Sequence, residues 1–347
     1  MSPERFEQIE TLYNDALALE PNARNAFLDR ACGTDSDLRQ EIESLLTSER
    51  SNTCLDTDAI QFAAESLAQQ DGAEFMGRML GRYQLLSLVG RGGMGEVYCG
   101  VDTRLNRLVA IKVLPAYMTD SREWSERLEQ EARAVAALNH PHICTLYDLG
   151  NDGGMHYLVF EYLIGELLSE RLAKSGLPLP ETLRYAIQIA DALVTTHQEG
   201  IIHCDLKPRN IMLTKAGVKL LDFGIAELRY ASDARVNDAV RDSASGGTLA
   251  YMAPEQIERR EKDTRTDIFG FGLVLYQMVT GRPAFLGNDQ ASLTQSILND
   301  TPAPASHYAP QTSPALDFLL ARCLAKDPSE RWQSICDVLF MLKWIAA

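Results

Sequence analysis

The stretch His203-Cys204-Asp205-Leu206-Lys207-Pro208-Arg209-Asn210 is followed, twelve residues after its end, by Asp222-Phe223-Gly224. Upstream, within residues 83–163, short β-type runs alternate with Gly and turn residues around one helical pattern at 121–138. Downstream of Pro180 the pattern is mostly helical to the end. A β-rich part followed by a helical body predicts a two-lobed α+β unit.

A glycine-rich run lies in the β-rich part. Gly90-Arg91-Gly92-Gly93-Met94-Gly95 fits the pattern G-x-G-x-x-G, which dinucleotide-binding folds also use. In those folds the glycines open a helix, whereas here Val97 and Tyr98 continue as a β-type run and Val109-Ala110-Ile111-Lys112 forms the next one. A glycine hairpin followed by a strand with a lysine indicates a flap over ATP phosphates, because glycine lets backbone N–H groups approach phosphate oxygens.

With these motifs in this order and spacing, residues 83 to about 343, roughly three quarters of the chain, resemble a bacterial (Hanks-type) serine/threonine protein kinase domain. The stretches 90–98 and 138–143 are similar to the bacterial members. The resemblance implies a kinase-like fold at 82–347, with a small β-rich N-lobe at 82–163 and a large helical C-lobe at 164–347. A short helical segment at 1–50, similar to a leader ahead of some bacterial kinases, and a linker at 51–81 would precede it.

The resemblance implies catalytic roles for five side chains. Asp205 matches the catalytic base that orients the acceptor hydroxyl, and Lys207 matches the lysine that steadies the γ-phosphate. Lys112 would contact the phosphates and pair with Glu131, whose distance to Asn139-His140-Pro141 favours it over the alternative Glu129. Thr248 matches a residue that contacts the catalytic Asp and Lys.

The resemblance also implies the cofactors, ATP and Mg²⁺, with Mn²⁺ able to substitute. Asn210 and Asp222 match the metal ligands, since oxygen donors suit a hard cation. Phe160 would be the gatekeeper, and Glu166 would reach the ribose. Glu161 and Leu163 would lie on the hinge and offer backbone groups to adenine. The other residues expected to bind the nucleotide belong to the flap and its neighbours and are Val89, Gly90, Arg91, Gly92, Gly93, Met94, Gly95, Val97, Ala110 and Lys112.

Two further matches concern structure rather than chemistry. Asp267 matches the aspartate that braces the catalytic loop from a buried helix. Glu255, in Ala253-Pro254-Glu255, would form a buried ion pair with Arg331. The apolar run from Phe269 to Val279 is too short to span a bilayer and is expected to form a buried helix.

The chain departs from the family pattern at Cys204, where the usual residue is arginine. That arginine commonly contacts a phosphorylated activation loop, and a thiol cannot replace a bidentate guanidinium. Activity is therefore expected to depend less on loop phosphorylation than in typical members of the family. Cys204 is expected to be a packed small residue, with a redox sensor as the alternative. Ser243 and Ser245 are the candidate phosphorylation sites.

Composition narrows the partners and the compartment. The 347 residues include 33 Lys and Arg and 48 Asp and Glu, a net charge of −15, and residues 1–81 alone hold 16 acids and 6 bases. This balance argues against nucleic acid and anionic membrane surfaces as partners. Seven scattered cysteines indicate reduced thiols, and with neither a signal peptide nor a membrane segment in this chain they predict a cytoplasmic location.

The sequence thus predicts an ATP-dependent serine/threonine protein kinase that acts in signalling on protein substrates and on itself. The alternative is a pseudokinase, an ATP-gated binding module whose residues 1–75 contact a partner. A kinase of small molecules is disfavoured, because Ala253-Pro254-Glu255 and Thr248 serve a platform for protein substrates. The N-terminal helices are expected to mediate self-association or docking.

Overall fold

The computed structural model describes residues 28, 31, 77–92, 95–115, 122–174, 176–223 and 249–347. The chain divides into two compact units, residues 1–71 with 104–107 and residues 72–103 with 108–347. Apart from Arg107, the first residue of strand β4, all the elements below belong to the second unit. The helical segment expected at 1–50 lies outside the described residues, except for residues 28 and 31.

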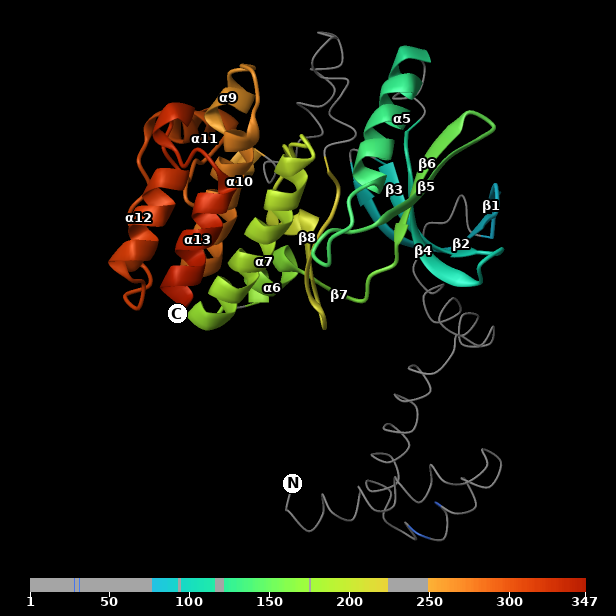
Figure 1. Cartoon of the computed structure of the whole chain (residues 1–347), viewed down its shortest axis with the longest axis horizontal. Helices are drawn as coiled ribbons and strands as arrows, with labels where there is room; N and C mark the ends of the chain where they lie inside the picture. Colours follow the sequence, from blue (N-terminus) through green and yellow to red (C-terminus); the bar gives the residue numbers. More distant parts are fainter. Residues whose placement is uncertain are drawn as a thin grey trace. The chain divides into compact units, whose positions relative to one another are not determined.

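The first part of this unit is a six-stranded sheet with the strand order β1-β2-β3-β4-β6-β5 (Figure 1). Helix α5 packs against β5 at the sheet. Strand β1 pairs with β2 and lies within the range expected to be linker. The elements are β1 (Met79–Leu80), β2 (Tyr83–Gly92), β3 (Gly95–Asp102), β4 (Arg107–Val113), α5 (Arg122–Ala136), β5 (Leu146–Asp152) and β6 (Met155–Glu161).

The alternation of side chains along β4 places the lysine of the site. Val109, Ile111 and Val113 enter a small apolar core on one face of the sheet. Because successive side chains of a strand point to opposite faces, Ala110 and Lys112 point to the other face. Lys112 is only 8% exposed there.

Strands β2 and β3 form the glycine hairpin that the sequence predicts. Gly92 lies opposite Gly95 in the register, and Gly95 has a φ of +119°. A Cβ at Gly95 would lie 2.0 Å from the carbonyl oxygen of Val113. Only glycine therefore fits this close approach of the hairpin to the end of β4.

The second part is mostly helical (Figure 1). Its described residues also form a three-stranded sheet of order β7-β8-β9. This arrangement agrees with the two-lobed α+β fold that the sequence predicts, with a β-rich N-lobe and a helical C-lobe. Its elements are β7 (Gly165–Leu167), α6 (Leu168–Lys174), α7 (Leu179–Gln198), η2 (Pro208–Asn210), β8 (Ile211–Thr214), β9 (Gly217–Leu220), η4 (Leu249–Tyr251), α9 (Pro254–Ile257), α10 (Thr264–Thr280), α11 (Gln290–Asn299), η5 (Ala305–His307), α12 (Pro314–Cys323), η6 (Pro328–Glu330) and α13 (Ile335–Ala346).

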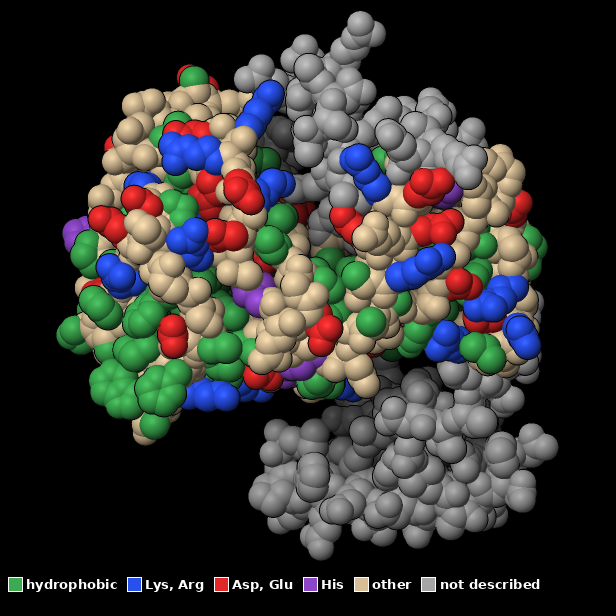
Figure 2. Space-filling view, turned by 45° about the horizontal axis from the view of Figure 1, so that its top comes forward, with side chains coloured by type: hydrophobic (Ala, Val, Ile, Leu, Met, Phe, Trp, Pro, Cys, Tyr) green, Lys and Arg blue, Asp and Glu red, His purple; other side chains and the backbone are tan. Residues whose placement is uncertain are grey.

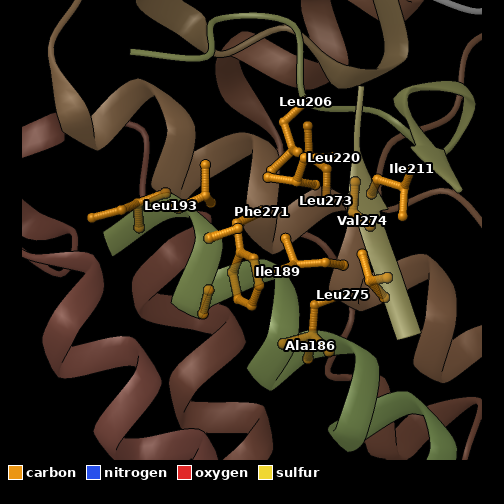
Figure 3. Packing of buried hydrophobic residues seen from close by; sticks show 14 of the residues in the cluster. Ala186, Ile189, Leu193, Leu206, Ile211, Leu220, Phe271, Leu273, Val274 and Leu275 are labelled. Atoms are coloured by element: carbon orange, nitrogen blue, oxygen red, sulfur yellow. The ribbon is translucent and has the colours of Figure 1, made fainter. Parts of the chain in front are cut away.

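Helix α10 forms the centre of the C-lobe core. Asp263 caps its N-terminus by accepting from the Arg265 amide, and Gly281 ends it with a φ of +69°. Its apolar residues are buried all round, which confirms the buried helix expected at 269–279. Figure 3 shows Phe271 and Leu275 of α10 packed with side chains of α7 such as Ile189.

The surface carries mixed charges. On the face drawn in Figure 2, acidic and basic side chains are interspersed, and hydrophobic side chains gather where α12 and α13 lie. The exposed aromatic residues of these two helices are Phe318, Phe340 and Trp344. No helix within the described ranges is long and apolar enough to cross a bilayer.

Candidate active site

The loop of residues 203–210, called here the catalytic loop, is held by one buried aspartate. Asp267 on α10 accepts hydrogen bonds from the backbone N–H groups of His203 and Cys204, each at 2.8 Å. The ring of His197 lies 2.8 Å from the same carboxylate. The brace expected of Asp267 is therefore present. It holds the loop through a turn in which Cys204 adopts a φ of +61°.

Asp205 lies at the centre of a small polar cluster. The Lys207 ammonium donates to both of its carboxylate oxygens, at 2.9 and 2.7 Å. The Asn210 amide donates to the Asp205 side chain at 2.9 Å and to its backbone oxygen at 2.8 Å. Because the Asn210 nitrogen faces Asp205, its side-chain oxygen remains available as a ligand for a cation.

Asp222 follows β9 and pairs with Lys112 of β4 across the two lobes, at 2.9 Å. Burial alone would raise the pKa of Asp222, but the ion pair and hydrogen bond with Lys112 outweigh it, with help from His203 and Lys207, so the pKa lies below its usual value. Asp222 is thus held ionised. Its φ of +48° is a left-handed conformation that few residues other than glycine adopt.

The end of β9 and the catalytic loop are neighbours. The Leu221 amide donates to the backbone oxygen of Asn210 at 2.8 Å. The ring of His203 lies 3.1 Å from the Leu221 oxygen and packs against Phe223. The structure therefore brings Lys112, Asp205, Lys207, Asn210 and Asp222 together at one place.

These residues fit a magnesium nucleotide. Mg²⁺ in phosphoryl-transfer sites usually takes one or two protein oxygens, with phosphates and water completing its shell. A carboxylate and a carboxamide, Asp222 and Asn210, match that donor set. Within the described ranges no three His, Cys, Asp or Glu side chains cluster to form a self-sufficient metal site.

The expected ion pair between Lys112 and Glu131 is not present. Lys112 is bound to Asp222 instead, and Glu131 on α5 has no ion pair with any described residue. Burial without a cation raises the pKa of Glu131 to about 7. The alternative, Glu129, is exposed and pairs with Arg133 of its own helix.

The structure describes the glycine hairpin except for Gly93 and Met94. Arg91 forms an ion pair with Glu96 across the hairpin, at 2.7 Å. Val89 is 58% exposed and Val97 is half-buried. A Cβ at Gly90 would meet no atom within 4 Å, so the backbone there is open to a ligand.

At the hinge, the Glu161 side chain points into the protein rather than toward a nucleotide. One of its oxygens accepts from the Thr145 amide at 2.8 Å and pairs with Lys219 of β9 at 2.7 Å. Lys219 also donates to the Ile143 oxygen. Lys219 was not expected at the site, and a lysine three residues before Asp222 carried no sequence signal. Phe160 is buried and Leu163 is half-buried.

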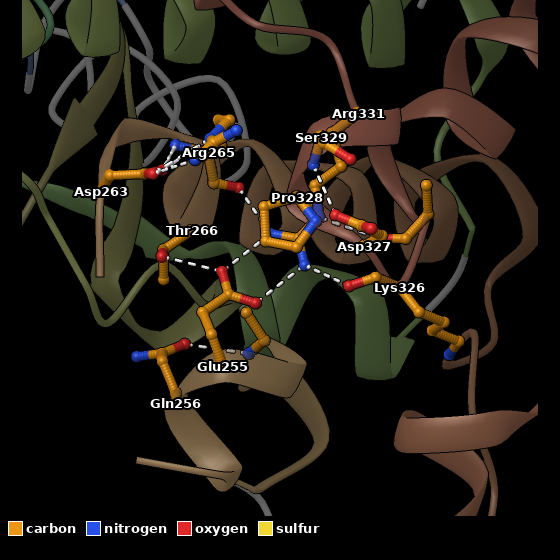
Figure 4. Close-up of polar contacts among 12 residues, drawn as sticks. Glu255, Gln256, Asp263, Arg265, Thr266, Lys326, Asp327, Pro328, Ser329 and Arg331 are labelled. Carbon is orange, nitrogen blue, oxygen red and sulfur yellow. Dashed lines mark hydrogen bonds and ion pairs between the residues drawn. The ribbon is translucent and has the colours of Figure 1, made fainter. Parts of the chain in front are cut away.

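Glu255 and Arg331 form the expected buried ion pair (Figure 4). Two nearly parallel contacts of 2.7 and 2.8 Å join the guanidinium to the carboxylate, and Thr266 donates to Glu255 as well. Arg331 is 1% exposed and Glu255 is 3% exposed.

Thr248, Ser243 and Ser245 lie outside the described residues.

Glu166 forms an ion pair with Lys174 of α6 at 2.6 Å, in which both side chains remain accessible to solvent. Its expected contact with the ribose stays a prediction. Cys204 is half-buried, and its backbone oxygen accepts from the Gln256 side chain at 2.7 Å.

Comparison with protein families matches residues 83–345 to the family described as "Protein kinase domain". Among curated proteins, a "Probable serine/threonine-protein kinase" of Streptomyces coelicolor is 40% identical over 263 residues, which cover 74% of this chain and 39% of that protein. Serine/threonine-protein kinase PknB of Mycolicibacterium smegmatis is 38% identical, over 74% of this chain and 42% of that protein. The chain thus spans about two fifths of the length of these relatives.

Among solved structures, the PknI kinase domain of Mycobacterium tuberculosis is similar with a TM-score of 0.62 and 27% identity. The similarity covers 78% of this chain and 99% of that one. Rad53 1–466 in complex with AMP-PNP is similar with a TM-score of 0.62 and 25% identity, over 74% of this chain and 64% of that one.

Proposed function

Because the chain belongs to the protein kinase family, we propose that it transfers the γ-phosphoryl group of ATP to serine and threonine hydroxyls of proteins, itself included. The observation that carries this proposal is the cluster of Asp205, Lys207 and Asn210 beside the Lys112–Asp222 pair. The relatives named as serine/threonine kinases support the acceptor class.

Each residue of the cluster has a separate role in phosphoryl transfer. Asp205 orients the acceptor hydroxyl and accepts its proton, while Lys207, 2.7 Å from Asp205, neutralises charge on the transferring phosphoryl group. Asn210 and Asp222 would hold Mg²⁺, or Mn²⁺ in its place, which supplies charge neutralisation on the phosphates. Catalysis then rests on positioning and electrostatic stabilisation.

The nucleotide would bind at the hinge and under the glycine hairpin. AMP-PNP, bound in the similar Rad53 structure, is a non-hydrolysable analogue of ATP and supports ATP as the nucleotide. Lys112 and Asp222 neutralise each other in the structure. Phosphates and a cation would compete with this pair for Lys112 and Asp222.

The test is phosphosite mass spectrometry of the full chain incubated with ATP and Mg²⁺, beside the Asp205→Asn variant and a sample with excess EDTA. The proposal predicts phosphoserine or phosphothreonine in the wild type and none in the other two. If the chain binds nucleotide but shows no transfer that depends on Asp205, the alternative, an ATP-gated binding module, would be favoured. One observation in favour of that alternative is that Glu131 has no ion pair with any described residue.

Two further proposals concern the setting of the enzyme. A cytoplasmic location is supported by the described cysteines, which form no disulfide with one another. Self-association or docking through residues 1–75 is tested by deleting them and comparing turnover and oligomeric state. No change in either would remove that idea.

A further inference from the structure

Arg209 is the charged residue of the catalytic loop that the proposed chemistry does not use. Asp205 and Lys207 are bound to each other, and Asn210 donates to Asp205. Arg209 is exposed and makes no ion pair or hydrogen bond with any residue that the structure describes. A guanidinium is always charged near neutral pH, so the positive charge of Arg209 has no partner among the residues that the structure describes.

The turn η2 sets the direction in which Arg209 lies. Asn210 is 6% exposed and faces Asp205, whereas its neighbour Arg209 lies on the solvent side of the same turn. Arg209 also acts electrostatically on Tyr251: burial raises the pKa of Tyr251 to about 12, and the Arg209 charge works against that rise. Arg209 therefore lies in the catalytic loop within electrostatic reach of Tyr251, two residues before Ala253-Pro254-Glu255, the platform expected for protein substrates.

Acidic side chains on the neighbouring elements do not cancel this charge. The turn η2 packs against β7 and α6. Glu166 of β7 is paired with Lys174, and Glu170 of α6 also acts on Lys174. Among the described residues, the carboxylates of β7 and α6 therefore interact with Lys174, and none forms an ion pair with Arg209.

We propose that Arg209 selects protein substrates with an aspartate or glutamate close to the acceptor hydroxyl. This inference rests on the proposed function. A guanidinium binds a carboxylate through two parallel hydrogen bonds, which gives direction as well as charge. The effect is local, because the net charge of −15 would repel an acidic substrate at long range. The chain's own sequence contains such acceptors, in Asp35-Ser36-Asp37 and Asp56-Thr57-Asp58.

The experiment compares synthetic peptides that differ in one residue. A neutral peptide with a single serine carries Asp, Asn or Lys at each flanking position in turn, and kcat/KM is measured with the full chain. The enzymes are the wild type, Arg209→Ala, Arg209→Glu and the control Arg322→Glu. Arg322 is exposed on α12, whose main packing partners are α10, α13 and η5.

The wild type and Arg322→Glu should prefer Asp over Asn at one or more positions by about two- to fivefold, the range of a solvent-exposed ion pair. Arg209→Ala should lose this ratio, and Arg209→Glu should favour Lys at the same positions. Mapping of self-phosphorylated sites gives a second measurement, in which Arg209→Glu should lose sites flanked by acids.

A wild type that shows no preference for acids, or an acid preference that survives in Arg209→Glu, would overturn the inference while leaving the kinase activity intact. Transfer to neither the peptides nor the chain itself would remove the proposed function and this inference together. Phosphorylation of the neutral peptide by the wild type, lost in Asp205→Asn, would show that the kinase activity holds even where the inference about Arg209 fails.

Discussion

The carboxylate of Glu131 on α5 is half-buried and has no ion pair with any described residue, and burial raises its pKa from 4.5 to about 7. An acid with a raised folded-state pKa holds its proton more tightly in the folded protein. Its contribution to stability is therefore complete below about pH 4.5 and is lost as the pH rises through about 7.

Replacing Glu131 with Gln should remove this decline. Relative to wild type, the free energy of unfolding of Glu131→Gln should gain about 1–2 kcal/mol between pH 5 and pH 8, after allowance for solvent screening. Urea denaturation of both proteins at pH 5 and at pH 8 measures this difference in the free energy of unfolding. Glu129→Gln, on the exposed side of the same helix, is the matched control. Parallel pH profiles for Glu131→Gln and wild type would contradict the assignment.

Cys204 holds the catalytic loop through its backbone, with its N–H bound to Asp267 and its oxygen to Gln256. A thiol cannot bind a phosphate as a guanidinium does, so removing all phosphate from the activation segment should leave most of the activity. The measurement is the peptide phosphorylation rate before and after phosphatase treatment, with intact mass confirming that phosphate is gone. A large loss of rate would show that another cation replaces the arginine.

At the scale of elements, Lys219 of β9 joins the hinge to the strand that ends at Asp222. Lys219→Met should leave Glu161 without its cation and loosen the hinge backbone that would bind adenine. The KM for ATP should rise about five- to tenfold, equivalent to about 1–1.4 kcal/mol, with a smaller change in kcat.

Two variants separate this positioning role from a general loss of structure. Lys219→Arg should recover most of the affinity for ATP. Lys215→Met, in the exposed turn before β9, should behave like wild type. An unchanged KM in a folded Lys219→Met enzyme would show that the ion pair with Glu161 does not position the hinge.

The Glu255–Arg331 pair joins α9 to η6 and lies out of water. Arg331→Met should cost about 3–5 kcal/mol of the free energy of unfolding, because Glu255 is left as an unpaired buried charge. Chemical denaturation of Arg331→Met beside the exposed control Arg322→Met tests this. A loss below about 1 kcal/mol would contradict the view that the pair is desolvated.

Both lobes and the buried helix α10 were predictable, because hydrophobic period and turn residues are local signals. The pair Glu255–Arg331 was predictable through the family's motif order. The partner of Lys112 could not be predicted from the sequence. Glu131 and Asp222 compete for its ammonium group, and which of them binds it depends on where α5 lies. The ion pairs of Lys219 with Glu161 and of Lys174 with Glu166 were not predicted. Neither lysine belongs to a motif, and only the fold places an acidic side chain beside it.

At the scale of the whole kinase unit, the site draws on both lobes. Lys112 comes from the six-stranded sheet, whereas Asp205 and Asn210 come from the loop that α10 braces. Contacts between the lobes, Lys112 with Asp222 and Glu161 with Lys219, hold these parts in one place. The central claim is that this arrangement transfers a phosphoryl group rather than merely binding a nucleotide.

The most direct measurement is the single-turnover rate of phosphoryl transfer by the full chain at saturating ATP and Mg²⁺, for wild type and Asp205→Asn, with the Kd for ATP measured in parallel. Loss of a general base predicts a rate lower by at least about 100-fold in Asp205→Asn, with the Kd little changed. Equal rates in the two proteins, or no transfer by the wild type despite bound ATP, would contradict the account.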